Sequence, residues 1–155
     1  MPFYYSIENT HTTSGTAATE ADAIRTTSGS TRTMLVSRLG VGASGAAQDN
    51  QVMLKAWRMS VASTAGSAVT PKPHDQSSPA SAFTAQTAPT IGTKETNAAK
   101  ILAFNSRAFV QWAAQNPDEC IALPAGGGAN GNIDLLDEQA AGSAVALRYS
   151  FTAYE

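Results

Sequence analysis

The sequence predicts an all-β protein, a β-sandwich or jelly roll with long loops and an extended N-terminal arm. Ala, Thr, Ser and Gly dominate the composition, while Leu, Glu and Lys, on which helical proteins rely, are sparse. Hydrophobic and polar residues alternate, most regularly where Val145, Leu147, Tyr149 and Phe151 share one parity. This period-two pattern is typical of a half-buried strand. About seven or eight short segments of strand character, separated by loops, predict a sandwich, a jelly roll or a barrel.

The length of 155 residues fits a single domain with one hydrophobic core. We therefore expect residues 1–155 to form one β-sandwich, with 1–33 as an extended arm because this part is polar and rich in Thr. Within the arm, a short first strand is expected around Tyr5 and a loop over 11–19. Residues 20–25 fit either one helical turn or part of a strand.

Alternation and turn residues predict the remaining strands. They are expected within 33–41, 51–63, 82–87, 100–114, 119–123, 133–136 and 145–154. Hydrophobic residues occupy both parities of 33–41, so we expect burial on both faces there. A helix is the alternative for 51–63, and one helix is the alternative to two strands joined near Asn105 for 100–114.

A long irregular section separates two of these strands. Residues 65–90 contain Pro71, Pro73, Pro79 and Pro89, which remove backbone donors and restrict the residues before them. We expect an extended surface excursion, because so long a loop in a compact domain is usually functional or interfacial.

The charge balance argues against two classes of partner. Charged residues make up 14% of the chain and the net charge is −2. Phosphate binding needs clustered Lys and Arg, so we predict no nucleic-acid partner. The sequence also has no basic patch for an anionic membrane and no run of ~20 apolar residues, so we predict no membrane partner. The first residues do not resemble a targeting segment.

One cysteine, Cys120, is present, which excludes an intrachain disulfide. It begins a short apolar run and follows two acidic residues. An electropositive setting that would activate a nucleophile is missing, so we expect a small buried hydrophobe. The absence of disulfides fits assembly in a reducing cytosol.

The candidates for catalysis are few. His11 and His74 lie in polar segments far apart in the sequence. A Ser-His-Asp triad would have to use His74 with Asp75 and one of many serines, but no Gly-x-Ser-x-Gly motif is present. We predict that the protein is not an enzyme, has no catalytic residues, and carries His74 in a surface loop beside Pro73.

Metal and cofactor sites are not predicted either. Asp134, Asp137 and Glu138 lie near a Gly-rich segment and Asp49 is isolated, and their spacing matches no EF-hand or zinc pattern. We expect solvated acids in turns. The segment 126–131 is rich in Gly but lacks the Gly-Lys-Ser/Thr ending of a phosphate-binding loop, so we expect a long hairpin or corner loop.

Trp57 and Trp112 share their parity with other apolar residues. We therefore expect both side chains to pack in the core or in an interface. Stacking on sugar rings, as in a lectin-like module, is the alternative.

Several features of residues 33–155 resemble a known family in their order along the chain. The segments 53–61 and 66–71 join a hydrophobic strand to a Val-Thr-Pro stretch and a Pro/Ala/Thr-rich excursion. An Ala-Gly-Gly loop at 124–128 and an alternating last strand at 145–154 follow. Together they are similar to the jelly-roll capsid cement (decoration) proteins of tailed phages. The resemblance implies a homotrimer that binds the major capsid protein on the outer capsid surface of the virion, after synthesis in the host cytoplasm.

The leading hypothesis is therefore a virion structural protein that stabilises the capsid shell. Residues 1–33 and 65–90 are its candidate contact segments. The alternative is a phage tail or fibre module that binds host glycans through Trp57 or Trp112. The third hypothesis is a hydrolase that uses His74.

Overall fold

The computed structural model describes residues 2–13, 19–26, 31–46, 49–87, 89–126, 132–137 and 144–155. In this part of the chain the secondary structure consists of twelve β-strands and one short 3-10 helix, without an α-helix. The prediction of an all-β sandwich is confirmed.

The elements follow one another as β1 (Tyr4–Thr12), β2 (Thr19–Thr26), β3 (Met34–Ala43), β4 (Gln51–Val61), β5 (Ser67–Val69), β6 (Lys72–Pro73), β7 (Phe83–Thr87), β8 (Thr93–Asn105), β9 (Val110–Ala113), η1 (Pro117–Glu119), β10 (Ile121–Leu123), β11 (Asn132–Asp137) and β12 (Ala146–Tyr154).

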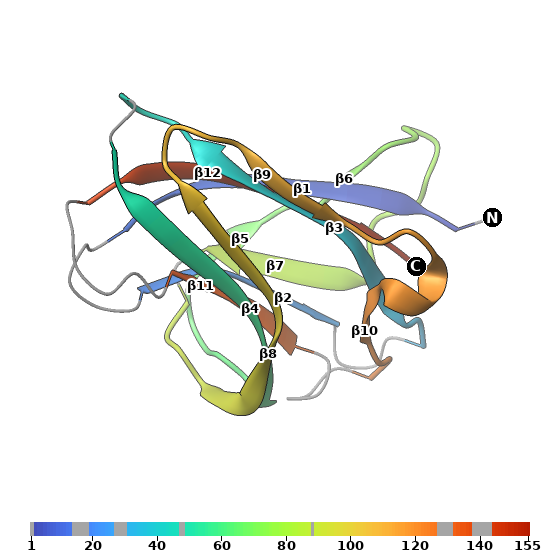
Figure 1. Cartoon of the computed structure of the whole chain (residues 1–155). Helices are drawn as coiled ribbons and strands as arrows, with labels where there is room; N and C mark the ends of the chain where they lie inside the picture. The colour runs from blue at the N-terminus through green and yellow to red at the C-terminus, as the bar shows by residue number, and fades with distance from the viewer. Residues whose placement is uncertain are drawn as a thin grey trace.

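Two antiparallel sheets of six strands each pack face to face (Figure 1). The first sheet has the order β10-β3-β12-β1-β6, and β9 also pairs with β3. The second sheet has the order β5-β7-β2-β11-β4-β8. The chain changes sheet between β1 and β2, between β2 and β3 and between β3 and β4. It changes again on both sides of β6, after β8 and on both sides of β11. Apart from the strands of the 65–90 segment, β1, β12, β3 and β9 of the first sheet lie opposite β2, β11, β4 and β8 of the second, which is the strand arrangement of a jelly roll.

The last strand, β12, lies in the middle of the first sheet. It pairs with β1 on one side and with β3 on the other. Leu147, Tyr149, Phe151 and Ala153 are all buried, and the residues between them are exposed or half-buried. The alternation read from the sequence is therefore the alternation between core and surface.

The β3 strand explains the hydrophobic residues on both parities of 33–41. Met34 and Val36 are buried at one parity, and Leu39 and Val41 at the other. The pairing with β12 shifts register between Thr152 and Ala153, so one residue of β3 is inserted as a β-bulge. The bulge exchanges the inward and outward positions, so β3 is not buried on both faces by a third layer.

The two segments with a helical alternative form strands. β4 pairs with β11 and β8, and its inward residues Val52, Leu54 and Ala56 follow a period of two. β8 and β9 are separate strands joined by a turn at Ser106–Arg107, so the two-strand prediction for 100–114 is confirmed. Residues 20–25 also belong to a strand, β2.

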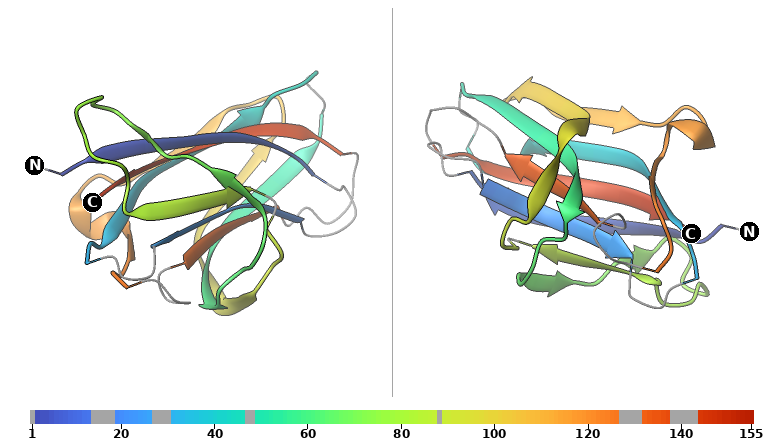
Figure 2. Two further views of the ribbon diagram at one scale, coloured as in Figure 1. Left: turned by 180° about the vertical axis from the view of Figure 1, so that it is seen from behind. Right: turned by 90° about the horizontal axis from the view of Figure 1, so that it is seen from below.

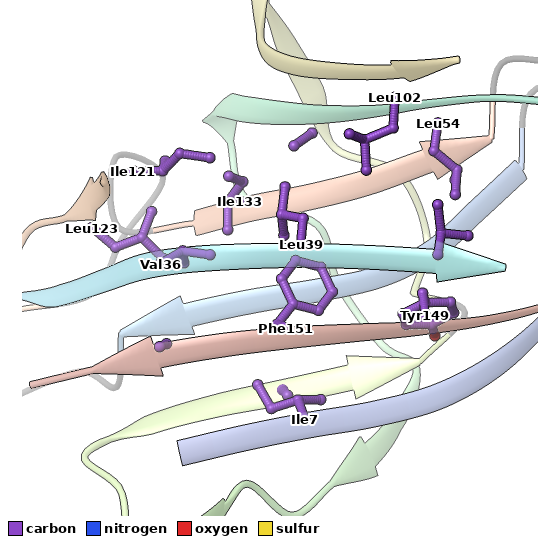
Figure 3. Close-up of a cluster of buried hydrophobic side chains, with 14 of the residues drawn as sticks. Ile7, Val36, Leu39, Leu54, Leu102, Ile121, Leu123, Ile133, Tyr149 and Phe151 are labelled. Carbon is purple, nitrogen blue, oxygen red and sulfur yellow. The ribbon is translucent and has the colours of Figure 1, made fainter. Parts of the chain in front are cut away.

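The core lies between the two sheets (Figure 3). Leu54, Leu102 and Ile133 of the second sheet face Leu39 and Phe151 of the first sheet. Aromatic rings within it meet edge to face, which is a preferred geometry for such pairs.

The expectation of an extended arm over 1–33 is corrected by the described parts of that segment. β1 lies between β12 and β6, and β2 lies between β7 and β11. Tyr5 and Ile7 are buried in the core, so β1 contributes apolar area that an arm would leave in water. His11 is also in β1 and is half-buried, not in a polar loop.

The excursion at 65–90 closes one edge of the sandwich (Figure 2). It contains the expected strand β7, and it adds β5 to the second sheet and β6 to the first. The Tyr5 hydroxyl donates to the Pro79 carbonyl at 3.0 Å, and the Tyr5 ring meets Phe83 at 5.5 Å. The buried Glu155 carboxylate accepts from the Ala82 N–H at 2.9 Å. The excursion is therefore integrated into the fold at several points.

Asp134 corrects the expectation of a solvated acid in a turn. It lies in β11 with an exposed fraction of 0% and accepts a hydrogen bond from the Ser63 hydroxyl. The same hydroxyl oxygen accepts from the Gly92 N–H at 2.9 Å. The network joins β11 to the chain on both sides of the excursion. A buried carboxylate requires such partners, because desolvation otherwise disfavours its charge.

We predict that Ser63→Ala lowers the free energy of unfolding by about 1–3 kcal/mol, because it removes a hydrogen-bond partner from two groups, one of them a buried carboxylate. Urea denaturation measures the change. Ser60→Ala is the matched control: its hydroxyl is exposed and donates only to the Thr93 carbonyl. The control should change stability by less than about 0.5 kcal/mol. Equal effects of the two substitutions would contradict the role given to Ser63.

Candidate functional site

The outer face of the first sheet is the candidate functional site. Its floor consists of the outward residues of the three central strands. They are Tyr4, Ser6, Glu8 and Thr10 of β1, Arg148, Ser150, Thr152 and Tyr154 of β12, and Arg38, Gly40 and Gly42 of β3. Most of these side chains are small or carry a hydroxyl, so this part of the surface lies below the larger side chains around it.

Strand register places four of these residues in one line across the sheet. Ser6 pairs with Lys72 on one side and with Thr152 on the other, and Thr152 pairs with Arg38. Directly opposite residues of antiparallel strands share a face. We call Lys72, Ser6, Thr152 and Arg38 the polar row; it has a cation at each end and two hydroxyls between them.

Hollows lie on both sides of the polar row. The first, of about 370 Å³, is lined by Tyr4, Ser37, Arg38, His74, Ala113, Ala114 and Thr152. The second, of about 490 Å³, is lined by Ser6, Glu8, Ala68, Val69, Thr70 and Lys72. The excursion therefore forms one wall of the face, and the chain after β9 forms the other.

The Phe109 ring packs directly against two glycines of this face. A Cβ atom at Gly40 would lie 3.0 Å from the Phe109 Cζ atom, and one at Gly42 would lie 3.2 Å from the Phe109 Cδ2 atom. Side chains at these positions would therefore displace the ring. Phe109 as a whole residue is nevertheless 66% exposed, so one side of the ring packs on the sheet and the other is open.

An ion pair lies beside Phe109. Arg148 Nη2 is 2.7 Å from Glu8 Oε2, and both side chains are largely exposed. Exposed pairs of this kind contribute little to stability, about 0.2–1 kcal/mol. The pair compensates the charge of Glu8 on this face.

Aromatic side chains occupy the end of the face next to the polar row. The Tyr4 ring lies 5.1 Å from the Tyr154 ring and stacks on His74 at 6.2 Å. Behind them, Cys120 Sγ lies 3.6 Å from the Tyr154 hydroxyl. Cys120 is half-buried and precedes β10, which corrects the expectation of a buried residue within an apolar strand.

His74 is exposed in a loop, as predicted. It contacts Ser6, which could not be identified from the sequence as its partner. Its Nε2 atom lies 2.5 Å from Ser6 Oγ. Asp75 instead accepts hydrogen bonds from the backbone and hydroxyl of Ser77, which lower the pKa of Asp75. The structure therefore brings a hydroxyl and an imidazole together, but Asp75 is directed to Ser77 and not to His74.

Of the remaining acidic and glycine candidates, the structure describes Asp49 and the backbone of Asp137. Asp49 accepts from Asn105 Nδ2 at 2.5 Å, and Asp137 ends β11. Glu138 and residues 127–131 lie outside the described residues. Across the described ranges, no group of three or more His, Cys, Asp or Glu side chains is placed to hold a metal ion.

Both tryptophans are half-buried, and each has a lysine ammonium over its ring. Lys94 Nζ lies 4.8 Å and Lys55 Nζ 5.7 Å from the Trp57 ring centroid. Lys100 Nζ lies 4.6 Å from the Trp112 centroid, and Trp112 packs against the core. The predicted packing role is confirmed for Trp112, whereas Trp57 lies on the outer side of the second sheet.

We predict that the Tyr154 hydroxyl loses its proton at a higher pH than an ordinary tyrosine. Its hydrogen bond with Cys120, then burial and nearby negative charge, raise its pKa from 10.0 to about 12. The folded state thus favours the protonated phenol, and this contribution to stability is lost as pH rises from about 10 to about 12. NMR of labelled tyrosine rings measures the pKa; Cys120→Ala should lower it, whereas an unchanged value would exclude the thiol as its cause.

We also predict that His11 makes the protein less stable in mild acid. Burial lowers its pKa below the usual 6.5, so the folded state favours neutral imidazole. The associated stability is present above pH 6.5 and is lost as pH falls toward the lower folded pKa. Urea unfolding between pH 7.5 and 5 tests this, and His11→Gln should reduce the slope. A variant as pH-dependent as the parent would refute the assignment.

Comparisons of the chain with family models, curated proteins and solved structures give no match. In the described part of the chain, no helix is long and apolar enough to span a membrane. The site is therefore characterised by its own geometry: a polar row, two adjoining hollows and one exposed aromatic ring on a sheet face.

Proposed function

We propose that this chain is a virion structural protein that acts as capsid cement. In this proposal it binds the outer surface of a shell of major capsid protein and holds neighbouring shell subunits together. Its location would be the virion surface, after synthesis in the host cytoplasm.

The outer face of the first sheet is the observation that supports this proposal most. It offers a broad contact area of small and hydroxyl side chains, with Phe109 exposed above it. Aromatic and Arg side chains are enriched in protein interfaces, and Lys and Glu are depleted. This face carries Tyr4, Phe109, Arg38 and Arg148, so its aromatic and Arg content fits that pattern, although it also carries Glu8 and Lys72.

The fold is compatible with this role by analogy alone. Jelly rolls occur in viral capsid and lectin domains, among other proteins, and a fold does not fix a function. The sequence resemblance to phage cement proteins is the reason for proposing a capsid role in particular. It also implies self-association as a homotrimer.

The mechanism would be thermodynamic linkage. A protein that binds the assembled shell, and not its separated subunits, stabilises the shell in proportion to RT ln(1 + [L]/Kd). At a free concentration one hundred times Kd this amounts to about 2.7 kcal/mol per site. Many sites on one shell would multiply the effect.

The glycan-binding alternative is less well supported by the tryptophans. Sugar rings stack on open aromatic faces, whereas Trp57 and Trp112 each have lysine ammonium groups over the ring. A glycan array that returned a specific ligand, with quenching of tryptophan fluorescence, would favour the alternative over capsid cement.

We predict that shells lacking this protein lose heat resistance and regain it when the purified chain is added. Scanning calorimetry of shells with and without the chain measures the shift in the temperature of disruption. The reason is preferential binding to the assembled state. Identical transitions at saturating protein would exclude a cement role, and electron microscopy of the decorated shells would locate the bound copies.

A further inference from the structure

We propose that the outer face of the first sheet docks an acidic protein surface, whose carboxylates are bound by the polar row. The inference rests on the proposed function only in taking that surface to belong to a shell protein. The partner is defined here by its chemistry, which is a negatively charged, folded protein surface.

The charges of the face carry the first part of the argument. Arg38 and Lys72 are exposed, and neither side chain forms an ion pair or hydrogen bond with any described residue. Glu8 is the one acidic residue of the floor, and Arg148 compensates it at 2.7 Å. The face thus has two uncompensated cations, although the chain as a whole has a net charge of −2.

The spacing of these cations carries the second part. Lys72 and Arg38 lie in one row across four neighbouring strands, with Ser6 and Thr152 between them. Strands are separated by about 4.8 Å, so the two backbone positions are about 14 Å apart. A row of this length can meet two carboxylates of a protein surface, one at each cation.

Phe109 adds exposed apolar area beside Arg148, and an aromatic side chain next to an Arg is typical of protein interfaces. Phe109 is largely exposed and its ring packs on Gly40 and Gly42, so the ring lies on the same face as the cations. Exposed aromatic and Arg side chains that become buried together are the usual energetic centres of protein interfaces. The cations would set orientation and association rate, and Phe109 would supply apolar contact.

The test uses the full chain with poly-L-glutamate as the acidic probe, followed by NMR. We expect salt-sensitive shifts at the amides of Ser6 and Thr152, since exposed charges are screened by added salt. The double variant R38E/K72E should weaken binding about tenfold or more. R107E/K94E is the matched control, because it makes the same change in net charge at two exposed cations outside the polar row. Equal weakening by control and double variant, or no shifts in the parent, would overturn the proposal.

Polygalacturonate at the same carboxylate concentration separates the two kinds of acidic partner. Tighter binding of poly-L-glutamate supports a protein surface. Tighter binding of polygalacturonate overturns it in favour of an acidic glycan. Thermal unfolding of each variant checks that exposed substitutions have left the fold intact.

Shell binding distinguishes failure of this inference from failure of the cement role. If the parent stabilises shells and R38E/K72E does so equally well, the docking face is wrong and the cement role stands. If the parent binds poly-L-glutamate through the polar row but leaves shells unchanged, the acidic docking face stands and the cement role fails. Phe109→Ser should weaken shell binding by about tenfold, and unchanged binding would remove Phe109 from the interface.

Discussion

The central position of β12 is the constraint on which the rest of the structure depends. Because β12 pairs with both β1 and β3, it aligns the outward residues of three strands that are distant in sequence. Its inward residues, including Tyr149 and Phe151, fill the core at the same time. One strand therefore fixes both the hydrophobic centre of the molecule and the order of side chains on its candidate docking face.

The excursion and the bulge in β3 adapt this framework to make a shaped surface. β6 adds Lys72 to the edge of the first sheet and places His74 beside Ser6. The bulge turns Arg38 outward into line with Thr152. Without these two irregularities the face would lack both cations of the polar row, so the features that interrupt regular pairing are also the ones that give the surface its chemistry.

The proposed cement role and the proposed acidic partner make different use of this surface. The cement role needs only contact area and preferential binding to an assembled shell. The acidic partner needs charge at defined positions, because Lys72 and Arg38 lie at opposite ends of the polar row. Weak ionic contacts and one apolar contact would be repeated at every copy on a shell, where multivalency adds to affinity.

The sequence by itself determined the all-β class, the inward residues of β12 and the exposure of His74, because period-two alternation and turn residues are local signals. It did not determine that Asp134 is buried, or that Ser6 lies beside His74. Only the tertiary structure decided these points, because strand order and register join segments far apart in the chain. The polar row depends on the same pairing, so no single stretch of sequence contains it.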